Sequence, residues 1–390
     1  MSTDSALTLT LKDLRPHLDD PTLTELCINR PHEAFIERPD GWHKVELPFA
    51  TFDWCKSLAK LIANATHQRI DETSPLLSAA LYTGERVQLV LPPATTDGTV
   101  AIAIRKPAAH SWTFAELVSG GIFRDTLTAC PLMAGPFGHP ALARQRQGKS
   151  VVSPCLPDSP LTPISDVVEP APNPLPLQWG KSDLDHTPNR LNALLKAGDY
   201  ESFLRLAVHS RQNILISGPT GSGKTTLTKA LIREIPPHER LITIEDTREL
   251  NLDTHPNHVR LYYSKDGQGR ATTTPKQLLE ATLRMKPDRV LLAELRSEEA
   301  FYYLRNINSG HPGSITSIHA ASCELAFEQL ILLVKESPAA RDLSRTDILQ
   351  LLHRVIDVVV QFQVSARHRR VREIWYRGNQ PQTYKPQTDP

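Results

Sequence analysis

A glycine-rich segment with the spacing of a phosphate-binding loop lies just past the middle of the chain. Residues 218–225 read GPTGSGKT and match the pattern G-x-x-x-x-G-K-[ST], in which backbone N–H groups curl around phosphate oxygens and the lysine contacts the β- and γ-phosphates. The residues expected to bind a nucleotide are Gly218, Pro219, Thr220, Gly221, Ser222, Gly223, Lys224, Thr225 and Thr226. The hydroxyl group of Thr225 is expected to bind Mg²⁺.

Two groups of acidic residues follow predicted strands and have the chemistry that hydrolysis requires. Residues 245–249 read EDTRE and begin with the last residue of LITIE (241–245), and Glu294 lies near the end of RVLLAEL (289–295). Hydrolysis of a phosphoanhydride needs Mg²⁺ and a group that orients or deprotonates water. Since parallel sheets bind ligands at the carboxyl ends of their strands, we expect both groups at the phosphate site. The alternative is that each is a solvated loop carboxylate or a helix cap.

A histidine lies at the end of another predicted strand. The segment GHPGSITSIHA (310–320) places His319 after the strand SITSIH. There the imidazole ring can hydrogen-bond a group that contacts the nucleotide. A single histidine, taken alone, is more often a structural residue, so this assignment depends on the other motifs.

The second half of the chain alternates strands and helices, as an arrangement around such a site requires. The predicted strands are 213–217, 241–245, 258–264, 289–295 and 314–319, with helical segments between them. Apolar strands separated by helices indicate a parallel sheet that is covered on both faces. The segment VIDVVVQFQV-SARHRR-VREIWYRG predicts a final hairpin, and residues 378–390 are expected to form a flexible tail.

The first third of the chain predicts a separate, small α+β domain over residues 1–135. Asp40-Gly41 is a favoured hairpin dipeptide, and 52–68 and 111–121 have the pattern of helices. Twelve of the 32 prolines lie between Pro131 and Pro188. Because proline fixes φ and removes a backbone donor, we expect a proline-rich linker over 136–188 and a second domain over 189–377. An irregular loop packed on one domain is the alternative.

Composition excludes several classes of protein. The 390 residues carry a formal net charge of +1, which is unlike the basic surface of a nucleic-acid-binding domain. We therefore expect no sequence-specific binding of nucleic acid. No apolar run approaches the ~18–20 residues that span a bilayer, and the start MSTDSALTL lacks the pattern of a secretory signal. The five cysteines form no CxxC pair, which favours reduced thiols in the cytoplasm over a zinc site.

Four motifs occur in one order: GPTGSGKTT, IEDTREL, LRMKPDRVLLAELR and GHPGSITSIHA. Together they resemble the hexameric secretion ATPase superfamily, and most closely the traffic ATPases of bacterial type IV secretion systems. TELCINRPHEAFIE, GERVQLVLPP and AIAIRKP are similar to the N-terminal part of that branch. The resemblance covers about residues 1–130 and 190–375. It implies an α/β fold with a RecA-like P-loop ATPase domain and a largely parallel sheet, preceded by a small α+β N-terminal domain and a Pro-rich linker.

The resemblance also implies roles for the acidic residues of the motifs. Glu249 matches the acid that activates water, and Glu245 and Asp246 would support the shell of water around Mg²⁺. Glu294 matches the Walker B acid, which holds Mg²⁺ through water. Lys224 is the catalytic lysine of the phosphate loop.

Further roles concern the sensor and the arginines. Thr316 and His319 would form a sensor pair that links the state of the phosphate to movement. Arg86 and Arg105 match N-terminal arginines that reach the nucleotide, where guanidinium groups suit the charge that develops on the γ-phosphate. A surface ion pair is the alternative for each arginine. Arg284 and Arg296, which flank the Walker B strand, are weaker candidates.

The activity implied by the resemblance is Mg²⁺-dependent ATP hydrolysis by a ring-shaped, hexameric motor that powers type IV secretion, conjugative transfer or pilus biogenesis. The implied cofactors are ATP and Mg²⁺. The implied partners are further copies of the chain, the channel base, a second ATPase and a coupling protein, with peripheral contact at the inner membrane. The segment 367–372, which reads RHRRVR, fits contact with anionic lipid or, alternatively, a charged hairpin turn.

Two other functions remain open at this point. One is a type II secretion or type IV pilus motor, although the assembly motors of those machines commonly carry a tetracysteine zinc segment, which this chain lacks. The other is a nucleotide-gated assembly scaffold with little turnover. Two departures from the family pattern are Ala293, where many relatives have glycine, and the long linker. At ~3 Å per residue, a linker of about 50 residues could carry the N-terminal domain to a neighbouring subunit.

Overall fold

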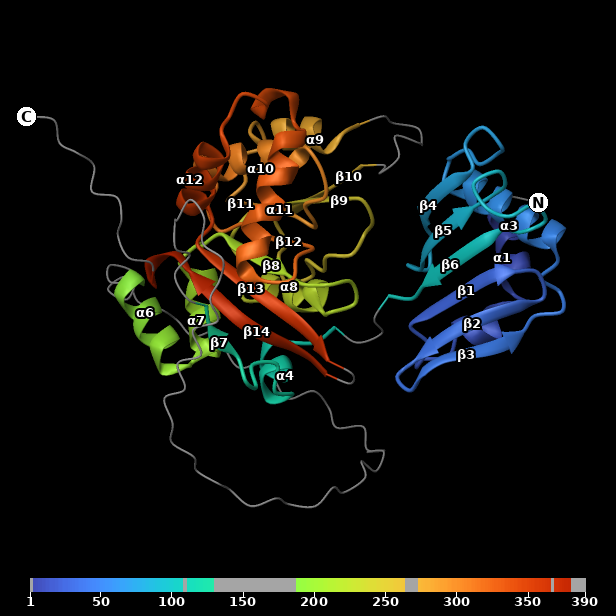
Figure 1. The fold of residues 1–390 in the computed structure, drawn as a ribbon, viewed down its shortest axis with the longest axis horizontal. Coiled ribbons are helices and arrows are strands. Elements are labelled where there is room, and N and C mark those ends of the chain that lie inside the picture. Colours follow the sequence, from blue (N-terminus) through green and yellow to red (C-terminus); the bar gives the residue numbers. More distant parts are fainter. Residues whose placement is uncertain (1–2, 108–110, 130–186, 264–272, 366–367, 380–390) are drawn as a thin grey trace, which may run out of the picture.

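The computed structural model describes residues 3–107, 111–129, 187–263, 273–365 and 368–379. Figure 1 shows two groups of elements, one built from the first third of the chain and one from the remainder. The basic segment 367–372 lies partly, and the expected linker almost entirely, outside the described residues. Residues 187 and 188 begin a helix, and residues 378 and 379 belong to a short 3₁₀ turn rather than to a tail.

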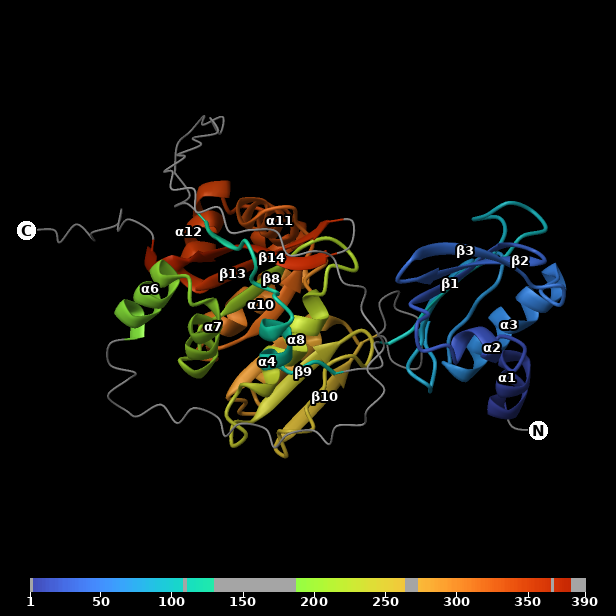
Figure 2. The same ribbon diagram turned by 90° about the horizontal axis from the view of Figure 1, so that it is seen from below.

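An antiparallel sheet of six strands forms the N-terminal domain, in the order β3-β2-β1-β6-β5-β4. Its elements are α1 (Thr3–Leu11), α2 (Arg15–Leu18), β1 (Glu25–Arg30), β2 (Glu33–Arg38), β3 (Gly41–Glu46), α3 (Phe52–Ala65), β4 (Leu76–Ala80), β5 (Arg86–Val90) and β6 (Ala101–Arg105). Alternate strand residues are buried against the three helices, which cover one face of the sheet (Figure 2). Strands β5 and β6 pair so that Arg86 lies opposite Arg105.

The second domain contains a largely parallel sheet, which confirms the predicted fold class. Its elements are α4 (Phe114–Ser119), β7 (Leu127–Thr128), α6 (Thr187–Ala197), α7 (Tyr200–His209), β8 (Ile214–Ser217), α8 (Lys224–Arg233), β9 (Leu241–Glu245), β10 (His258–Tyr262), α9 (Pro275–Thr282), β11 (Arg289–Leu292), α10 (Glu299–Asn308), β12 (Ile315–Ile318), α11 (Cys323–Glu336), η1 (Pro338–Ala340), α12 (Arg345–Val355), β13 (Val358–Ser365), β14 (His368–Tyr376) and η2 (Arg377–Asn379). The strands run in the orders β10-β9-β11 and β12-β8-β13-β14-β7. A bond from Leu295 N to Ser317 O (2.9 Å) joins the two groups of strands.

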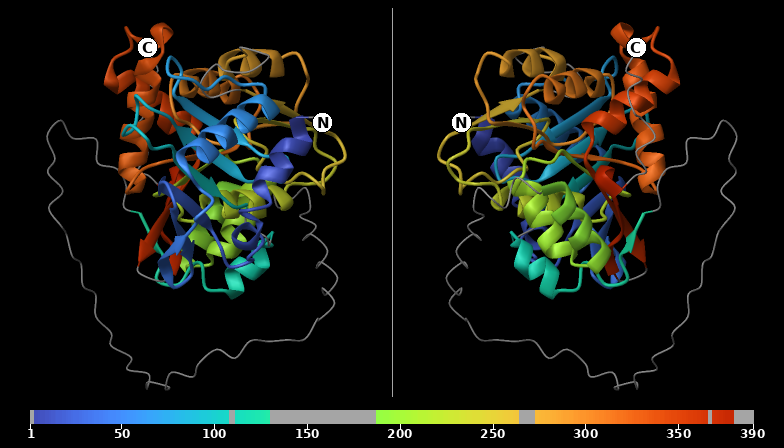
Figure 3. Two further views of the ribbon diagram at one scale, coloured as in Figure 1. Left: turned by 90° about the vertical axis from the view of Figure 1, so that its right-hand side faces the viewer. Right: turned by 90° about the vertical axis from the view of Figure 1, so that its left-hand side faces the viewer.

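Every residue of β8, β9, β11 and β12 is buried. Burial on both faces explains why these strands are almost continuously apolar. One core cluster joins the sheet to α6, α7 and α8, and another joins it to α10, α11 and α12. Figure 3 shows the green helices and the orange helices in different parts of the second domain. The buried strands therefore fix the positions of the side chains at their carboxyl ends.

Residues 111–129 pack differently from the expected division at residue 135. The predicted helix forms as α4, with a capping box between Thr113 and Glu116. However, Phe114 and Ile122 belong to the core of the second domain, and β7 pairs with β14. The physical reason is that an apolar helix face can pack against either core. Tertiary contacts, which the sequence of the helix does not show, decide which core it packs against. The structure thus places residues 111–129 with the second domain.

The C-terminal hairpin completes the sheet beside the phosphate loop. Strand β13 pairs in parallel with β8 and antiparallel with β14, which confirms the predicted hairpin. Its register sets Gln361 opposite Ser217, and it brings Phe362 against the loop that follows β8. Among the described helices, none is long and apolar enough to cross a membrane.

Candidate active site

The phosphate loop connects β8 to α8 and requires glycine at two of its positions. Gly218 has φ +154°, and a Cβ atom there would lie 2.7 Å from Cβ of Phe362 and 2.9 Å from Oγ of Ser222. Gly223 is the N-cap of α8, with φ +101° and no side-chain cap. The backbone N–H groups at this helix start are therefore left for another acceptor, and the helix dipole favours an anion there. Pro219, Thr220 and Gly221 are exposed at the crest of the loop.

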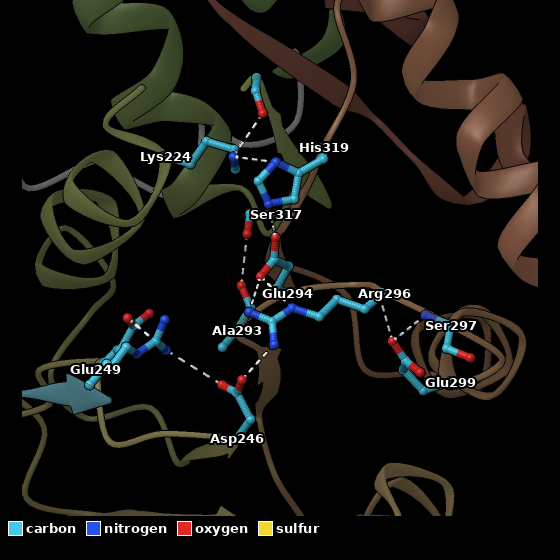
Figure 4. A network of polar contacts seen from close by, with 12 residues as sticks. Lys224, Asp246, Glu249, Ala293, Glu294, Arg296, Ser297, Glu299, Ser317 and His319 are labelled. Carbon is cyan, nitrogen blue, oxygen red and sulfur yellow. Dashed lines mark hydrogen bonds and ion pairs between the residues drawn. The ribbon is translucent and has the colours of Figure 1, made fainter. Parts of the chain in front are cut away.

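Lys224 is the first residue of α8, and its side chain is held inside the loop. The ammonium group donates to O of Gly218 (2.7 Å) and O of Pro219 (2.9 Å), and it lies 3.3 Å from Nδ1 of His319. Burial lowers the pKa of Lys224 to about 8, and Glu294 opposes this shift. The carbonyl oxygens orient the lysine without neutralising its charge, so the loop presents a cation to a phosphate group (Figure 4).

Glu294 lies two residues beyond the end of β11 and is placed between two side chains. Its Oε1 atom is 2.5 Å from Nε2 of His319, and its Oε2 atom accepts from Nε of Arg296 at 2.6 Å. Burial lowers the pKa of His319, although Glu294 raises it. A neutral ring that donates from Nε2 to Glu294 can accept at Nδ1 from Lys224. His319 therefore links the phosphate-loop lysine directly to the strand-end acid.

The acidic loop after β9 carries Asp246 and Glu249 toward the N-terminal domain. Nη2 of Arg86, on β5, lies 2.7 Å from Oε1 of Glu249 and 3.5 Å from Oδ1 of Asp246. Burial raises the pKa of Glu249, Arg86 lowers it, and the charge of Asp246 raises it. A buried carboxylate with a raised pKa is a stronger base than an exposed one. Arg86 therefore favours the ionised form of the acid that is predicted to activate water.

Glu245 does not join this group of side chains. Its carboxylate accepts from Oγ1 of Thr243 and from the backbone N–H groups of Glu249 and Leu250, each at 2.8 Å. The side chain is fully buried at the end of β9. Glu245 thus shapes the loop that presents Glu249, and this position differs from the expected one beside Mg²⁺. The sequence alone does not show which of Glu245 and Glu249 faces the phosphate site, because both lie near the carboxyl end of the same strand.

The other predicted residues differ in how deeply they are buried. Arg105 is exposed at the end of β6, and its charge lowers the pKa of Glu249 and of Lys224. Thr316 is fully buried within β12, three residues before His319, which directly follows that strand. Thr225 and Thr226 lie in the first turn of α8, where both are half-buried.

Arg296 is the residue whose importance the motifs understated. Its Nη1 atom is 2.5 Å from Oδ2 of Asp246, and its Nη2 atom is 2.5 Å from Oε2 of Glu294. The only signal in the sequence was its position two residues after the strand-end acid. Figure 4 shows that its guanidinium group connects the acidic loop to Glu294, so the polar contacts run from Glu249 to Lys224.

The chemistry of these groups fits a nucleotide and a divalent cation. The buried hydroxyl group of Ser222 has no hydrogen-bond partner among the described residues, and it lies within the uncapped start of α8. The hydroxyl group of Ser222 and the backbone N–H groups at the start of α8 are donors that suit phosphate oxygens. The hydroxyl group of Thr225 and the carboxylate of Glu294 are hard oxygen donors, the class that Mg²⁺ prefers. The arrangement has the donors to bind a triphosphate, and the carboxylate of Glu249 can accept a proton.

Comparison with known proteins gives one consistent family. A family model described as "Type II/IV secretion system protein" matches residues 186–375. The protein named Type IV secretion system protein VirB11 from Bartonella quintana is 43% identical over 372 residues, which are 95% of this chain and 93% of the relative. The crystal structure of the VirB11 ATPase from Brucella suis is 39% identical and covers 97% of this chain and 96% of its own, with a TM-score of 0.47.

A more distant structure shows the fold alone. The ATPase DotB from Legionella pneumophila is 14% identical, with a TM-score of 0.52, and covers 92% of this chain and 76% of its own.

Proposed function

We propose a mechanism for this ATPase. It starts from the fact that the chain belongs to the VirB11 family of type IV secretion system proteins. As a member of that family it hydrolyses ATP as the motor of a type IV secretion system. Its relatives place it with that machine rather than with a type II secretion or type IV pilus motor. We infer that hydrolysis depends on Mg²⁺, that Thr225 and Glu294 hold the ion, the latter through water, and that Glu249 activates the attacking water.

The observation that carries this proposal is the contact of His319 with both Lys224 and Glu294. A triphosphate in the loop competes with the carbonyl oxygens and with His319 for the ammonium group of Lys224. When bound, Mg²⁺ would neutralise part of the phosphate charge. A change at either partner alters the hydrogen bonds of His319, and strand β12 transmits that change to Thr316. This supports a sensor role for the pair.

The N-terminal arginines supply positive charge from the other side of the site. Arg86 contacts Glu249, and Arg105 lies opposite Arg86 across the β5–β6 pair. Guanidinium groups there can stabilise the charge that develops on the transferred phosphoryl group. The acid that activates water and an arginine that stabilises charge would then be brought together only when the two domains meet. We therefore propose that domain contact is a condition of turnover.

We also propose that the working form is a ring of identical subunits, a hexamer. Its further partners would be the channel base, the second ATPase and the coupling protein, at the cytoplasmic side of the inner membrane. Within one chain Arg86 contacts the acidic loop of the same chain. Because residues 111–129 already pack in the second domain, the expected linker follows them and does not separate the two domains. Light scattering with and without Mg-ATP tests the ring, and a monomer under both conditions contradicts it.

Phosphate release from the purified protein tests the catalytic assignment. We expect the Lys224→Ala and Glu294→Gln variants to be at least ~100-fold slower than the unaltered protein, because each loses a charge that contacts phosphate or the metal. Circular dichroism establishes that the variants are folded. Equal rates in all three proteins contradict hydrolysis at this site and favour a nucleotide-gated scaffold with little turnover.

A further inference from the structure

The guanidinium group of Arg296 lies between the two acidic parts of the site. It donates from Nε to Oε2 of Glu294 at 2.6 Å, and its Nη1 atom lies 2.5 Å from Oδ2 of Asp246. We propose that Arg296 is a positioning residue for ATP hydrolysis, which fixes the separation between the strand-end acid and the loop that presents Glu249. This inference rests on the proposed function of those acids.

The backbone of Arg296 is itself held in place. The N–H groups of Arg296 and Ser297 donate to Oε1 of Glu299, at 2.6 and 2.9 Å. Glu299 is buried at the start of α10 and is only 6% exposed. A carboxylate at a helix start is favoured by the helix dipole as well as by these bonds. The guanidinium group therefore projects from a fixed point.

Asp246 is shared between guanidinium groups of the two domains. Its Oδ2 atom contacts Arg296, and its Oδ1 atom lies 3.5 Å from Nη2 of Arg86. Arg86 in turn contacts Glu249 at 2.7 Å. Three carboxylates gathered at one edge of a sheet repel one another unless cations lie between them. Arg296 supplies the cation between Asp246 and Glu294, and Arg86 supplies the one between Asp246 and Glu249.

The geometry separates Arg296 from the arginines that are proposed to reach phosphate. Its Nε, Nη1 and Nη2 atoms all contact carboxylates of the protein. Three of its five N–H groups are thereby directed at carboxylates rather than at a nucleotide. The planar fork of arginine can bridge two carboxylates, whereas the ammonium group of lysine is a single point of charge. A lysine at this position should therefore restore charge without restoring the full geometry.

The test compares Arg296→Gln, Arg296→Lys and the control Arg345→Gln in the full-length protein. Arg345 forms an ion pair with Glu328 on the surface, and its side chain is 58% exposed, so its loss should change little. We measure kcat and KM for ATP, and the Kd for ADP. Because a small displacement of catalytic groups can cost about 100-fold in rate, we expect kcat of Arg296→Gln to fall by roughly that factor.

The pattern across variants separates positioning from a general structural role. We expect the Kd for ADP and the KM for ATP to change less than ~3-fold in Arg296→Gln, which also shows that the variant is folded. Arg296→Lys should recover about 10-fold of the lost kcat. In Arg296→Ala, free guanidinium ion at non-denaturing concentration should raise kcat, and urea at the same concentration should not.

Three results overturn the inference. If Arg296→Gln keeps more than half of kcat while the unaltered protein hydrolyses ATP, the proposed function stands and the positioning role is wrong. If kcat and nucleotide binding fall together in Arg296→Gln and Arg296→Lys alike, Arg296 acts on the fold or on binding. Absence of turnover in the unaltered protein, relative to Lys224→Ala, contradicts the proposed function and this role with it.

Discussion

Nη2 of Arg86 lies 2.7 Å from Oε1 of Glu249, so a strand of the N-terminal domain contacts the acid that is proposed to activate water in the second domain. Of the two partners, Glu249 is the one whose chemistry depends on the contact. Burial raises the pKa of Glu249, and the charge of Arg86 lowers it. The N-terminal domain therefore influences how much of the base is ionised.

The Arg86→Gln variant should shift the pH dependence of hydrolysis. Loss of the positive charge raises the pKa of Glu249 further, so the base becomes protonated at higher pH and the acidic limb of kcat/KM moves upward. We also expect kcat at its optimum to fall by about 10-fold or more, because a guanidinium group near the phosphate is lost. Steady-state rates between pH 5 and 9 measure both effects. Arg30→Gln is the control, since Arg30 forms an exposed pair with Glu33 in the same domain; a shift of equal size there would argue against a local effect.

Nucleotide binding should weaken as pH rises through about 8. Burial lowers the pKa of Lys224 to about 8, and phosphate favours the charged lysine. Above that pKa the free protein has lost the proton that the complex needs, so the Kd for ADP should rise by about 10-fold per pH unit. Calorimetry in buffers with different ionisation enthalpies should show proton uptake on binding near pH 8.5. Lys224→Arg stays charged, and its affinity should be flat over this range; a flat profile in the unaltered protein contradicts the lowered pKa.

Gly218→Ala should impair nucleotide binding more than Gly221→Ala. Both positions have positive φ, but a Cβ atom on Gly218 meets Cβ of Phe362 at 2.7 Å, whereas one on Gly221 has no atom within 4 Å among the described residues. At Gly221 only the conformational cost of about 1–2 kcal/mol applies. At Gly218 the loop or β13 must also move. Titration with a fluorescent ADP analogue gives the two affinities, and the reverse order would show that β13 does not form the wall behind the loop.

Phe114→Ala should destabilise the second domain although Phe114 precedes the expected linker. The ring is 1% exposed in the second core, and the guanidinium carbon of Arg205 lies 5.1 Å from its centroid. Loss of a buried phenylalanine costs about 3–5 kcal/mol. Hydrogen exchange should therefore quicken in α7 and α8 and stay unchanged in β1–β6. Trp42→Ala, at a site 51% exposed on β3, is the control, and faster exchange confined to the N-terminal sheet would place α4 with that domain instead.

The sequence predicted the elements better than it predicted their partners. The sequence predicts a capped helix over 111–121 that ends at Gly120-Gly121, and the structure shows α4 there with a capping box between Thr113 and Glu116, which is a local feature. Its membership of the second core depends on Phe114 meeting distant residues, and no local pattern reports that. The same distinction explains Glu245 and Glu249. Glu245 is the last residue of β9 and Glu249 follows it, yet only backbone geometry decides that Glu245 turns inward to bind the N–H groups of Glu249 and Leu250.

The phosphate loop was predictable because one short segment supplies its entire geometry. Gly218, Gly223 and Lys224 act through backbone that lies within seven residues. The contacts of Arg296 are hard to predict because its partners lie at the ends of two different strands. Glu294 follows β11, and Asp246, which follows β9, is 50 residues away in the sequence. Ion pairs between distant segments are set by the fold, so the sequence indicates the charges of a site before it indicates their pairing.

The rate of phosphate release in the Glu249→Gln variant tests the central claim most directly. Glutamine keeps the shape of the side chain and its capacity to contact Arg86 but cannot accept a proton from water. We predict that Glu249→Gln binds ATP with an affinity within ~3-fold of the unaltered protein and releases phosphate at least ~100-fold more slowly. Equal rates of release in the two proteins would contradict the role of Glu249 as the base that activates water.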